Sequence, residues 1–159
     1  MTVKPHIMAS HIPHIMVVEA RFYEDLSDAL WEGAQRALDT VGATYERFTV
    51  PGALEIPAVI RLAHLAAEGG QMAKPFDGYV ALGCVIRGET THYETVCNES
   101  ARGLMTLATD FGLCIGNGIL TCENDEQAWV RAKANELDKG GGAALAALSL
   151  IAARKQLVS

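Results

Sequence analysis

The chain has 159 residues, half of which are hydrophobic, and it carries a formal net charge of −6 at pH 7. This length fits one domain with a sizeable core, and the chain has no apolar run long enough to span a membrane. The negative charge argues against nucleic acid as a partner, because phosphate backbones require clustered Lys and Arg.

Residues 1–13 are predicted to form a flexible N-terminal tail, followed by a single domain over residues 14–159. The tail contains two His and two Pro but no apolar segment of the kind that directs secretion, so a cytoplasmic protein is expected. His6, His11 and His14 match no known metal-ligand spacing, and a loose tail explains them better than a metal site does.

The four cysteines lie in apolar contexts, and no two of them form a C-x-x-C pair. They are Cys84, Cys97, Cys114 and Cys122. This pattern favours reduced core residues over disulfides or metal ligands.

The first half of the chain alternates between strand and helix patterns. The apolar run 15–18 predicts a buried strand, and helical periodicity follows from Glu24 to Leu38, with Gly42 just past the helix end. Residues 44–50 predict a second strand that ends at Pro51 and Gly52.

A second helix is expected from about Glu55 to Glu68, before a turn-rich connection and an apolar strand over residues 79–82. Leu62 and Leu65 fall outside the main apolar stripe of this helix. They therefore indicate that the helix has a second apolar neighbour.

Residues 83–92, with the sequence GCVIRGETTH, form the central stretch of the chain. They follow the apolar strand as a glycine-bearing turn and lead into a third helical pattern over residues 91–111. Such a turn presents backbone N–H groups and the positive end of a helix dipole to an anion, typically phosphate. Thr90 and Thr91 can cap the helix, and His92 adds a side chain that titrates near neutrality. On this stretch alone, an active site and a structural turn with a solvated His remain equal alternatives.

The last part of the chain predicts one more strand and two helices. Apolar residues on both sides of Gly116, Asn117 and Gly118 indicate a fourth strand, with a bulge or a close approach of a ligand at the glycines. A short polar helix is expected over residues 125–135, and a last helix over 142–153. The last helix is apolar nearly all round, more than one sheet face can cover, so a homo-oligomer is expected.

Strands that alternate with helices predict an α/β fold with a central four-stranded, mainly parallel sheet and helices on both faces. Ligands of such folds bind beyond the C-terminal ends of the strands. Phe22, residues 52–55, residues 88–92 and residues 118–121 are all expected at this rim. Four separate segments therefore converge on one candidate site.

Three motifs in order resemble one known family. They are residues 50–57 (VPGALEIP), residues 83–93 (GCVIRGETTHY), and residues 118–121 (GILT) followed by Glu126, Gln127, Ala128 and Arg131. Together they resemble 6,7-dimethyl-8-ribityllumazine synthases from Ala20 to the C-terminus. The resemblance implies a three-layer, flavodoxin-like sandwich and a transferase of riboflavin biosynthesis.

The implied reaction condenses 5-amino-6-(D-ribitylamino)uracil with 3,4-dihydroxy-2-butanone 4-phosphate and releases phosphate and water, without a metal or an organic cofactor. Members of the family assemble as pentamers with active sites between adjacent subunits, and some members close twelve pentamers into a capsid. In this chain, residues 133–138 depart from the Gly- and Asn-containing segment of capsid formers. A free pentamer, or a decamer of stacked pentamers, is therefore expected rather than a capsid.

The resemblance also implies roles for individual residues. His92 is the implied proton-transfer residue. The implied ribitylaminouracil-binding residues are Phe22, Ala53, Leu54, Glu55, Val85 and Asn117. The implied phosphate-binding residues are Gly88, Glu89, Thr90, Arg131 and Lys139, with Arg131 reaching in from a neighbouring subunit. Taken singly, four of these residues are better explained structurally: Phe22 as a core aromatic, Glu55 as an N-terminal helix charge, and Arg131 and Lys139 as solvated helix charges. Their joint placement at one rim is what favours the site.

Two positions depart from the family pattern. Tyr23 stands where many members have Asn, and Asn117 stands where an aromatic residue often precedes the Gly-x-Leu-Thr motif. Both departures concern the pocket for the pyrimidine ring. They motivate an alternative function, a flavin- or lumazine-binding paralogue with little catalytic activity. A weaker alternative is another small phosphosugar enzyme on a similar sheet.

Overall fold

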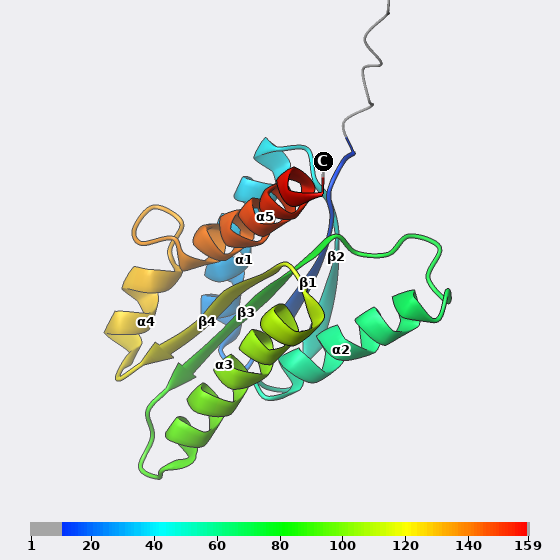
Figure 1. The fold of residues 1–159 in the computed structure, drawn as a ribbon. Helices are drawn as coiled ribbons and strands as arrows, with labels where there is room; N and C mark the ends of the chain where they lie inside the picture. The colour runs from blue at the N-terminus through cyan, green and yellow to red at the C-terminus, as the bar shows by residue number, and fades with distance from the viewer. Residues whose placement is uncertain (1–10, 159) are drawn as a thin grey trace, which may run out of the picture.

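The computed structural model describes residues 11–158, so most of the predicted tail, including His6, lies outside the described residues. Strands and helices alternate along the described chain (Figure 1). Their bounds are β1 (His14–Ala20), α1 (Glu24–Thr40), β2 (Thr44–Val50), α2 (Glu55–Glu68), β3 (Gly78–Ile86), α3 (His92–Phe111), β4 (Ile115–Cys122), α4 (Asp125–Ala132) and α5 (Lys139–Leu157).

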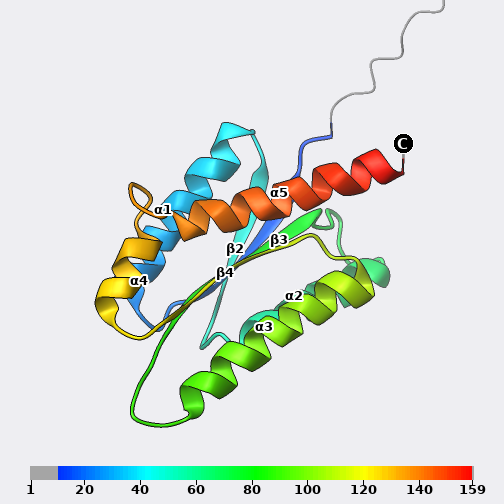
Figure 2. The ribbon, with the colours of Figure 1, turned by 60° about the vertical axis from the view of Figure 1, so that its left-hand side comes forward.

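The four strands form one sheet in the order β2-β1-β3-β4, and every neighbouring pair is parallel. Helices α1, α4 and α5 cover one face of the sheet, and α2 and α3 cover the other (Figures 1 and 2). The predicted three-layer α/β fold is therefore confirmed.

Strand β1 lies at the centre of both hydrophobic cores. All seven of its residues are buried. Ile15 and Val17 pack with α1 and α5, whereas Met16 and Val18 pack with α2 and α3. A parallel strand that is covered on both faces is apolar at successive positions, which is why this segment reads as an uninterrupted apolar run.

Several predicted boundaries agree with the structure. Strand β2 and helix α2 have the predicted bounds. Gly42 follows the end of α1 with a φ of +68°, a left-handed conformation that favours glycine at this position. These boundaries could be predicted because strong hydrophobic periodicity and flanking turn residues mark them in the sequence.

Strand β3 is longer than predicted. Residues 83–86 continue the strand and pair with β4, from Gly83 opposite Ile119 to Ile86 opposite Cys122. The turn therefore spans residues 87–91, and the prediction of a turn at Gly83 was wrong. Backbone pairing with β4 extends the strand through this glycine, because pairing is a long-range contact that local residue types do not report.

The glycines of β4 do not form the bulge that was predicted for them. The strand is continuous and its register with β3 is regular, so the predicted bulge is absent from this pair. A Cβ atom on Gly116 would lie 1.8 Å from the carbonyl oxygen of Ala143. Gly116 therefore admits the backbone of α5 rather than a ligand.

The last two helices also differ from their predicted bounds. Helix α4 ends at Ala132, and α5 begins at Lys139 rather than at residue 142. Asp138 stands at the N-cap of α5, where its Oδ1 accepts a hydrogen bond from the Gly141 N–H at 3.0 Å. This side-chain cap allows the helix to begin before the glycine run, despite the low helix propensity of glycine.

Histidine His14 is not part of a loose tail, because it is the first residue of β1 and only 5% exposed. Its ring nitrogens lie 2.7 Å from Thr44 Oγ1 and 3.0 Å from Glu46 Oε2, and the ring stacks on Phe76. His11, still within the predicted tail, hydrogen-bonds Asp77. Both side chains are thus engaged with the domain.

The four cysteines are free, as predicted, with Cys114 and Cys122 buried and Cys84 and Cys97 half-buried. Among residues 11–158, no three His, Cys, Asp or Glu side chains gather closely enough to hold a metal ion. None of the helices in this range has both the length and the hydropathy needed to cross a bilayer.

Candidate active site

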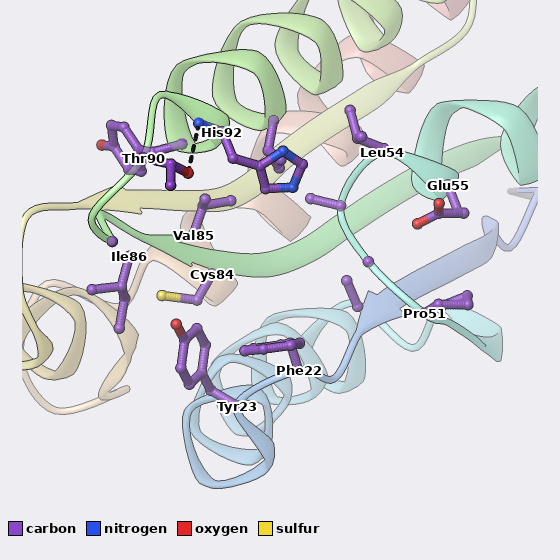
Figure 3. A pocket seen from close by; sticks show the side chains of 16 residues that line it. Phe22, Tyr23, Pro51, Leu54, Glu55, Cys84, Val85, Ile86, Thr90 and His92 are labelled. Carbon is purple, nitrogen blue, oxygen red and sulfur yellow. Dashed lines mark hydrogen bonds between the residues drawn. The ribbon is translucent and has the colours of Figure 1, made fainter.

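A cavity of about 550 Å³ opens beyond the C-terminal ends of β1 and β3 (Figure 3). Four segments form it: the connection from β1 into α1, the connection from β2 into α2, the end of β3, and the start of α3. Its lining residues are Ala20, Phe22, Tyr23, Pro51, Gly52, Ala53, Leu54, Glu55, Cys84, Val85, Ile86, Gly88, Thr90, His92, Tyr93 and Val96. The volume is in the range of small-molecule sites.

Most of the predicted site residues meet at this cavity. Those that line it are Phe22, Ala53, Leu54, Glu55, Val85, Gly88, Thr90 and His92. Those that do not are Glu89, Asn117, Arg131 and Lys139. Three of the four segments expected at this rim supply lining residues, namely Phe22, residues 52–55 and residues 88–92. Residues 118–121, also expected there, do not line the cavity.

Two adjacent aromatic residues form one wall of the cavity. The ring of Phe22 is 75% exposed, and it contacts the ring of Tyr23 edge to face, with centroids 4.9 Å apart and planes at 78°. Figure 3 shows both rings at one end of the pocket, with the Tyr23 hydroxyl toward Cys84. An exposed aromatic face of this kind suits a flat, conjugated ligand.

The connection from β2 to α2 supplies a carboxylate at the opposite side. Glu55 is the first residue of α2, and its N–H donates to the Gly52 carbonyl at 3.2 Å. A Cβ atom on Gly52 would approach Glu55 Oε2 to 3.1 Å, so glycine leaves room for the carboxylate to fold back over the turn. Such a group accepts hydrogen bonds from ligand hydroxyls.

The turn over residues 87–91 leads directly into α3. The hydroxyl of Thr90 accepts a hydrogen bond from the His92 N–H at 3.3 Å, whereas the N-cap residue Thr91 makes no such bond through its side chain. Of the two threonines expected to cap the helix, Thr90 is thus the one that does so. Within residues 11–158, the N–H groups of residues 88–90 have no protein acceptor, which leaves them available to an anion. Figure 3 shows the His92 imidazole pointing into the pocket, opposite Leu54.

An arginine clamp holds this turn in place. Arg87 donates from Nε to Glu123 Oε2 at 2.7 Å, and its Nη1 pairs with Glu94. Its guanidinium lies over the Tyr93 ring at 4.3 Å, and its N–H donates to the Cys122 carbonyl at 2.9 Å. The hydrogen bonds to the two carboxylates raise the pKa of Arg87, and the bond from Arg87 lowers the pKa of Glu94. The clamp therefore ties the end of β3 to β4 and α3.

One thiol, that of Cys84, lines the cavity. Burial raises the pKa of Cys84 to about 12, with the neighbouring Cys122 thiol adding to the effect. A thiol with this pKa stays protonated at neutral pH, and the thiolate is the nucleophilic form. Cys84 therefore acts as part of the cavity wall and not as a nucleophile.

The predicted site residues outside the cavity lie on the β4 side of the molecule, except Glu89 in the turn. Asn117 pairs with Ala81 in the edge strand β4, and its Oδ1 accepts from the Ile119 N–H at 2.9 Å. Arg131, on α4, donates to the Gln127 carbonyl at 3.0 Å, and Lys139 is the first residue of α5. These three residues do not line the cavity of their own chain.

Residues 13–155 match the family model for 6,7-dimethyl-8-ribityllumazine synthase. The chain is also similar to individual members. It is 59% identical to 6,7-dimethyl-8-ribityllumazine synthase 1 of Rhizobium meliloti over 144 residues, which cover 91% of this chain and 93% of the relative. It is 58% identical to the synthase of Agrobacterium fabrum, covering 91% and 97%, and 57% identical to that of Sphingopyxis alaskensis, covering 90% and 96%.

The chain belongs to the 6,7-dimethyl-8-ribityllumazine synthase family. The resemblance found in its three motifs is thereby confirmed. Lumazine synthases are transferase enzymes, and the relatives above all carry that enzyme's name. The alternative of a binding paralogue with little activity is therefore not favoured.

In this member of the lumazine synthase family, several residues that line the cavity were not predicted from the sequence. Val96 lies four positions after His92 and so shares its side of α3, and Tyr93 follows His92 directly in the first turn of the helix. The apolar character of both residues had indicated core positions. The Arg87 clamp was also missed. Glu123 is 36 positions away from Arg87, and only the pairing of β3 with β4 brings the two together.

Proposed function

We propose that this chain condenses 5-amino-6-(D-ribitylamino)uracil with 3,4-dihydroxy-2-butanone 4-phosphate to form 6,7-dimethyl-8-ribityllumazine, with release of phosphate and water. The observation that carries the proposal is the cavity, where Phe22, Glu55 and His92 meet around one space. Each comes from a different segment of the chain, and each has chemistry that this reaction uses. Membership of the lumazine synthase family supports the same reaction.

The cavity has a place for each part of the uracil substrate. The exposed face of Phe22 stacks on the pyrimidine ring, and backbone groups of Ala53 and Val85 bond the ring edges. Leu54 packs against the ligand at the mouth of the cavity. The Glu55 carboxylate accepts hydrogen bonds from the ribityl hydroxyls, which a flexible polyol chain needs to be held in one conformation.

The turn at the start of α3 is the proposed phosphate site. The N–H groups of Gly88, Glu89 and Thr90 have no protein acceptor among the described residues, and they precede the positive end of the α3 dipole. The Arg87 clamp keeps the turn in place before the substrate arrives. A preformed anion site of this kind loses little conformational entropy on binding.

The reaction requires positioning and proton transfer more than covalent catalysis. The amine of one substrate attacks the ketone of the other to give an imine and water, phosphate then leaves, and a second condensation closes the ring with loss of another water. The substrates supply the reacting groups, and the neutral Cys84 thiol supplies no nucleophile. His92, which projects into the cavity beside the phosphate turn, transfers the protons.

We propose that the site is completed by a neighbouring subunit. Arg131, Lys139 and Asn117 lie away from the cavity of their own chain, so they reach a phosphate or pyrimidine site only across an interface. Exposed apolar side chains support such an interface. These are Leu62 (64% exposed) and Leu65 (46%) on α2, and Leu145 (55%) and Leu150 (44%) on α5.

We expect a homopentamer in solution, because the family resemblance implies five subunits and a ring places one chain's Arg131 beside the next chain's cavity. Glu136 and Asp138, in the segment between α4 and α5, and the negative net charge disfavour closure of rings into a shell. Size exclusion with light scattering at low and physiological salt measures the mass. A mass of five or ten chains fits the proposal. A megadalton particle would refute the free ring, and a fully active monomer would refute the shared site.

The proposed reaction is tested by mixing the two substrates with the purified protein and recording lumazine fluorescence against a protein-free background. We expect faster formation of lumazine, together with release of phosphate. Protein that binds the product tightly but leaves the rate at background would contradict the enzyme and support a binding function.

We also propose that the protein is cytoplasmic. All four cysteines are free, which is typical of proteins in reducing compartments. Its substrates are small metabolites of a biosynthetic route. Fractionation of cells that express the full chain tests this location, and recovery with an exported marker enzyme would contradict it.

A further inference from the structure

The orientation of Phe22 depends on very few contacts. Its ring is 75% exposed although it forms a wall of the cavity. Within residues 11–158, its aromatic contact is the edge-to-face pair with Tyr23. An exposed side chain with so few packing contacts samples several rotamers, and only one of these presents its face to a ligand in the cavity.

The residues on both sides of Phe22 are held by hydrogen bonds. Arg21 bonds the buried carboxylate of Glu19 at 3.2 Å and the Asp28 carboxylate at 2.6 Å. The Tyr23 carbonyl accepts from both the N–H and the hydroxyl of Ser27, each at 2.9 Å. The ring of Phe22, and not its backbone, is therefore the part of this segment that needs support.

Tyr23 occupies a position where helix stability alone favours another residue. It is the N-cap residue of α1 and has an extended backbone, the conformation from which Asn, Asp, Ser or Thr caps a helix through its side chain. Tyr23 makes no such hydrogen bond. Its ring instead packs against the core between α1 and the sheet, lines the cavity and contacts Phe22.

We propose that Tyr23 is a positioning residue that braces the Phe22 ring and so sets the affinity of the cavity for flat heteroaromatic ligands. The proposal rests on the proposed function, because it assigns the braced ring to the pyrimidine part of the substrate. The other side of the Tyr23 ring packs against the core. The edge-to-face contact with Tyr23 therefore restricts the motion of the Phe22 ring, which is otherwise free to turn.

The test compares variants at position 23 by titration with 6,7-dimethyl-8-ribityllumazine, followed by fluorescence. Tyr23→Asn removes the brace and supplies a capping side chain, so we expect weaker lumazine binding by about two- to tenfold, the worth of an aromatic pair. The core loses the packing of the Tyr23 ring while the new side chain caps α1, so the thermal midpoint is expected to fall only slightly. Tyr23→Phe keeps the ring and is expected to restore most of the affinity lost in Tyr23→Asn.

Two further variants separate bracing from general stability. Trp31 and Tyr45 form a second edge-to-face pair, with centroids 5.2 Å apart, outside the cavity. Tyr45→Asn is therefore a matched control that lowers the thermal midpoint without weakening lumazine binding. In a Phe22→Ala background, Tyr23→Asn is expected to cause no further loss, because no ring remains to be braced.

Three outcomes would overturn the proposal. The first is that Tyr23→Asn binds lumazine as tightly as wild type, and the second is that Tyr23→Asn weakens lumazine binding further in the Phe22→Ala background. The third is that Tyr23→Phe binds lumazine as weakly as Tyr23→Asn. The last outcome would assign the effect to the hydroxyl. Tyr23→Leu, which keeps an apolar side chain without an aromatic edge, serves the same test if Tyr23→Asn does not fold. Failure of the proposed function is distinct, since it appears as wild-type protein that forms no lumazine.

Discussion

Arg131→Ala is expected to raise the KM for the phosphate substrate by about 10- to 100-fold, the worth of a charged hydrogen-bonded pair. The guanidinium binds only the phosphate end of the combined site, so the KM for the uracil substrate is expected to change far less. Steady-state rates with each substrate varied in turn measure the two constants. The selectivity of the change identifies Arg131 as a phosphate ligand.

Arg36→Ala is a suitable control for the loss of a helix cation. Arg36 is exposed on α1, pairs with Glu32 in the preceding turn and lies outside the cavity. Its removal is expected to leave both KM values unchanged. Equal weakening of both substrates by Arg131→Ala would contradict the assignment and indicate instead a general disturbance of α4.

The elements that sequence predicted well are those fixed by local patterns. Helix α2 and strand β2 have clear periodicity between turn residues, and Gly42 has the positive φ that a helix end favours. The errors arose where a distant segment decides the structure. Pairing with β4 extends β3 past Gly83, and the approach of α5 explains Gly116.

The candidate site shows the same division. Residues that lie next to strand ends, such as Phe22, Glu55 and His92, were placed at the rim because the fold class alone determines where strand ends meet. The side-chain partners of Arg87 are Glu123, directly after β4, and Glu94 in α3, and no local signal in the sequence joins them to Arg87. Arg131 is a separate case, because its proposed ligand lies in another copy of the chain.

His92→Asn is expected to slow turnover by about 10- to 100-fold and to leave residual activity. A positioned acid–base group contributes typically about 10²–10⁴-fold, and the spontaneous reaction of these substrates with each other places this case at or below the low end of that range. The phosphate turn and the aromatic wall still hold both substrates in the variant, so positioning persists. The turnover number at saturating substrates measures the effect. His64→Asn, on α2 outside the cavity, is the matched control.

Mixing the two defective proteins then tests the roles of His92 and Arg131 together. Each variant alone has sites that lack one group, whereas a mixed ring contains some sites with His92 from one chain and Arg131 from its neighbour. Refolding His92→Asn with Arg131→Ala is therefore expected to recover activity above the sum of the separate proteins.

Complete loss of activity in His92→Asn alone would contradict the role of His92 as a dispensable proton shuttle. If activity does not recover in the mixture, His92 and Arg131 must act in the site of the same chain. Because Arg131 lies outside the cavity of its own chain, the chain would then have to adopt a different conformation.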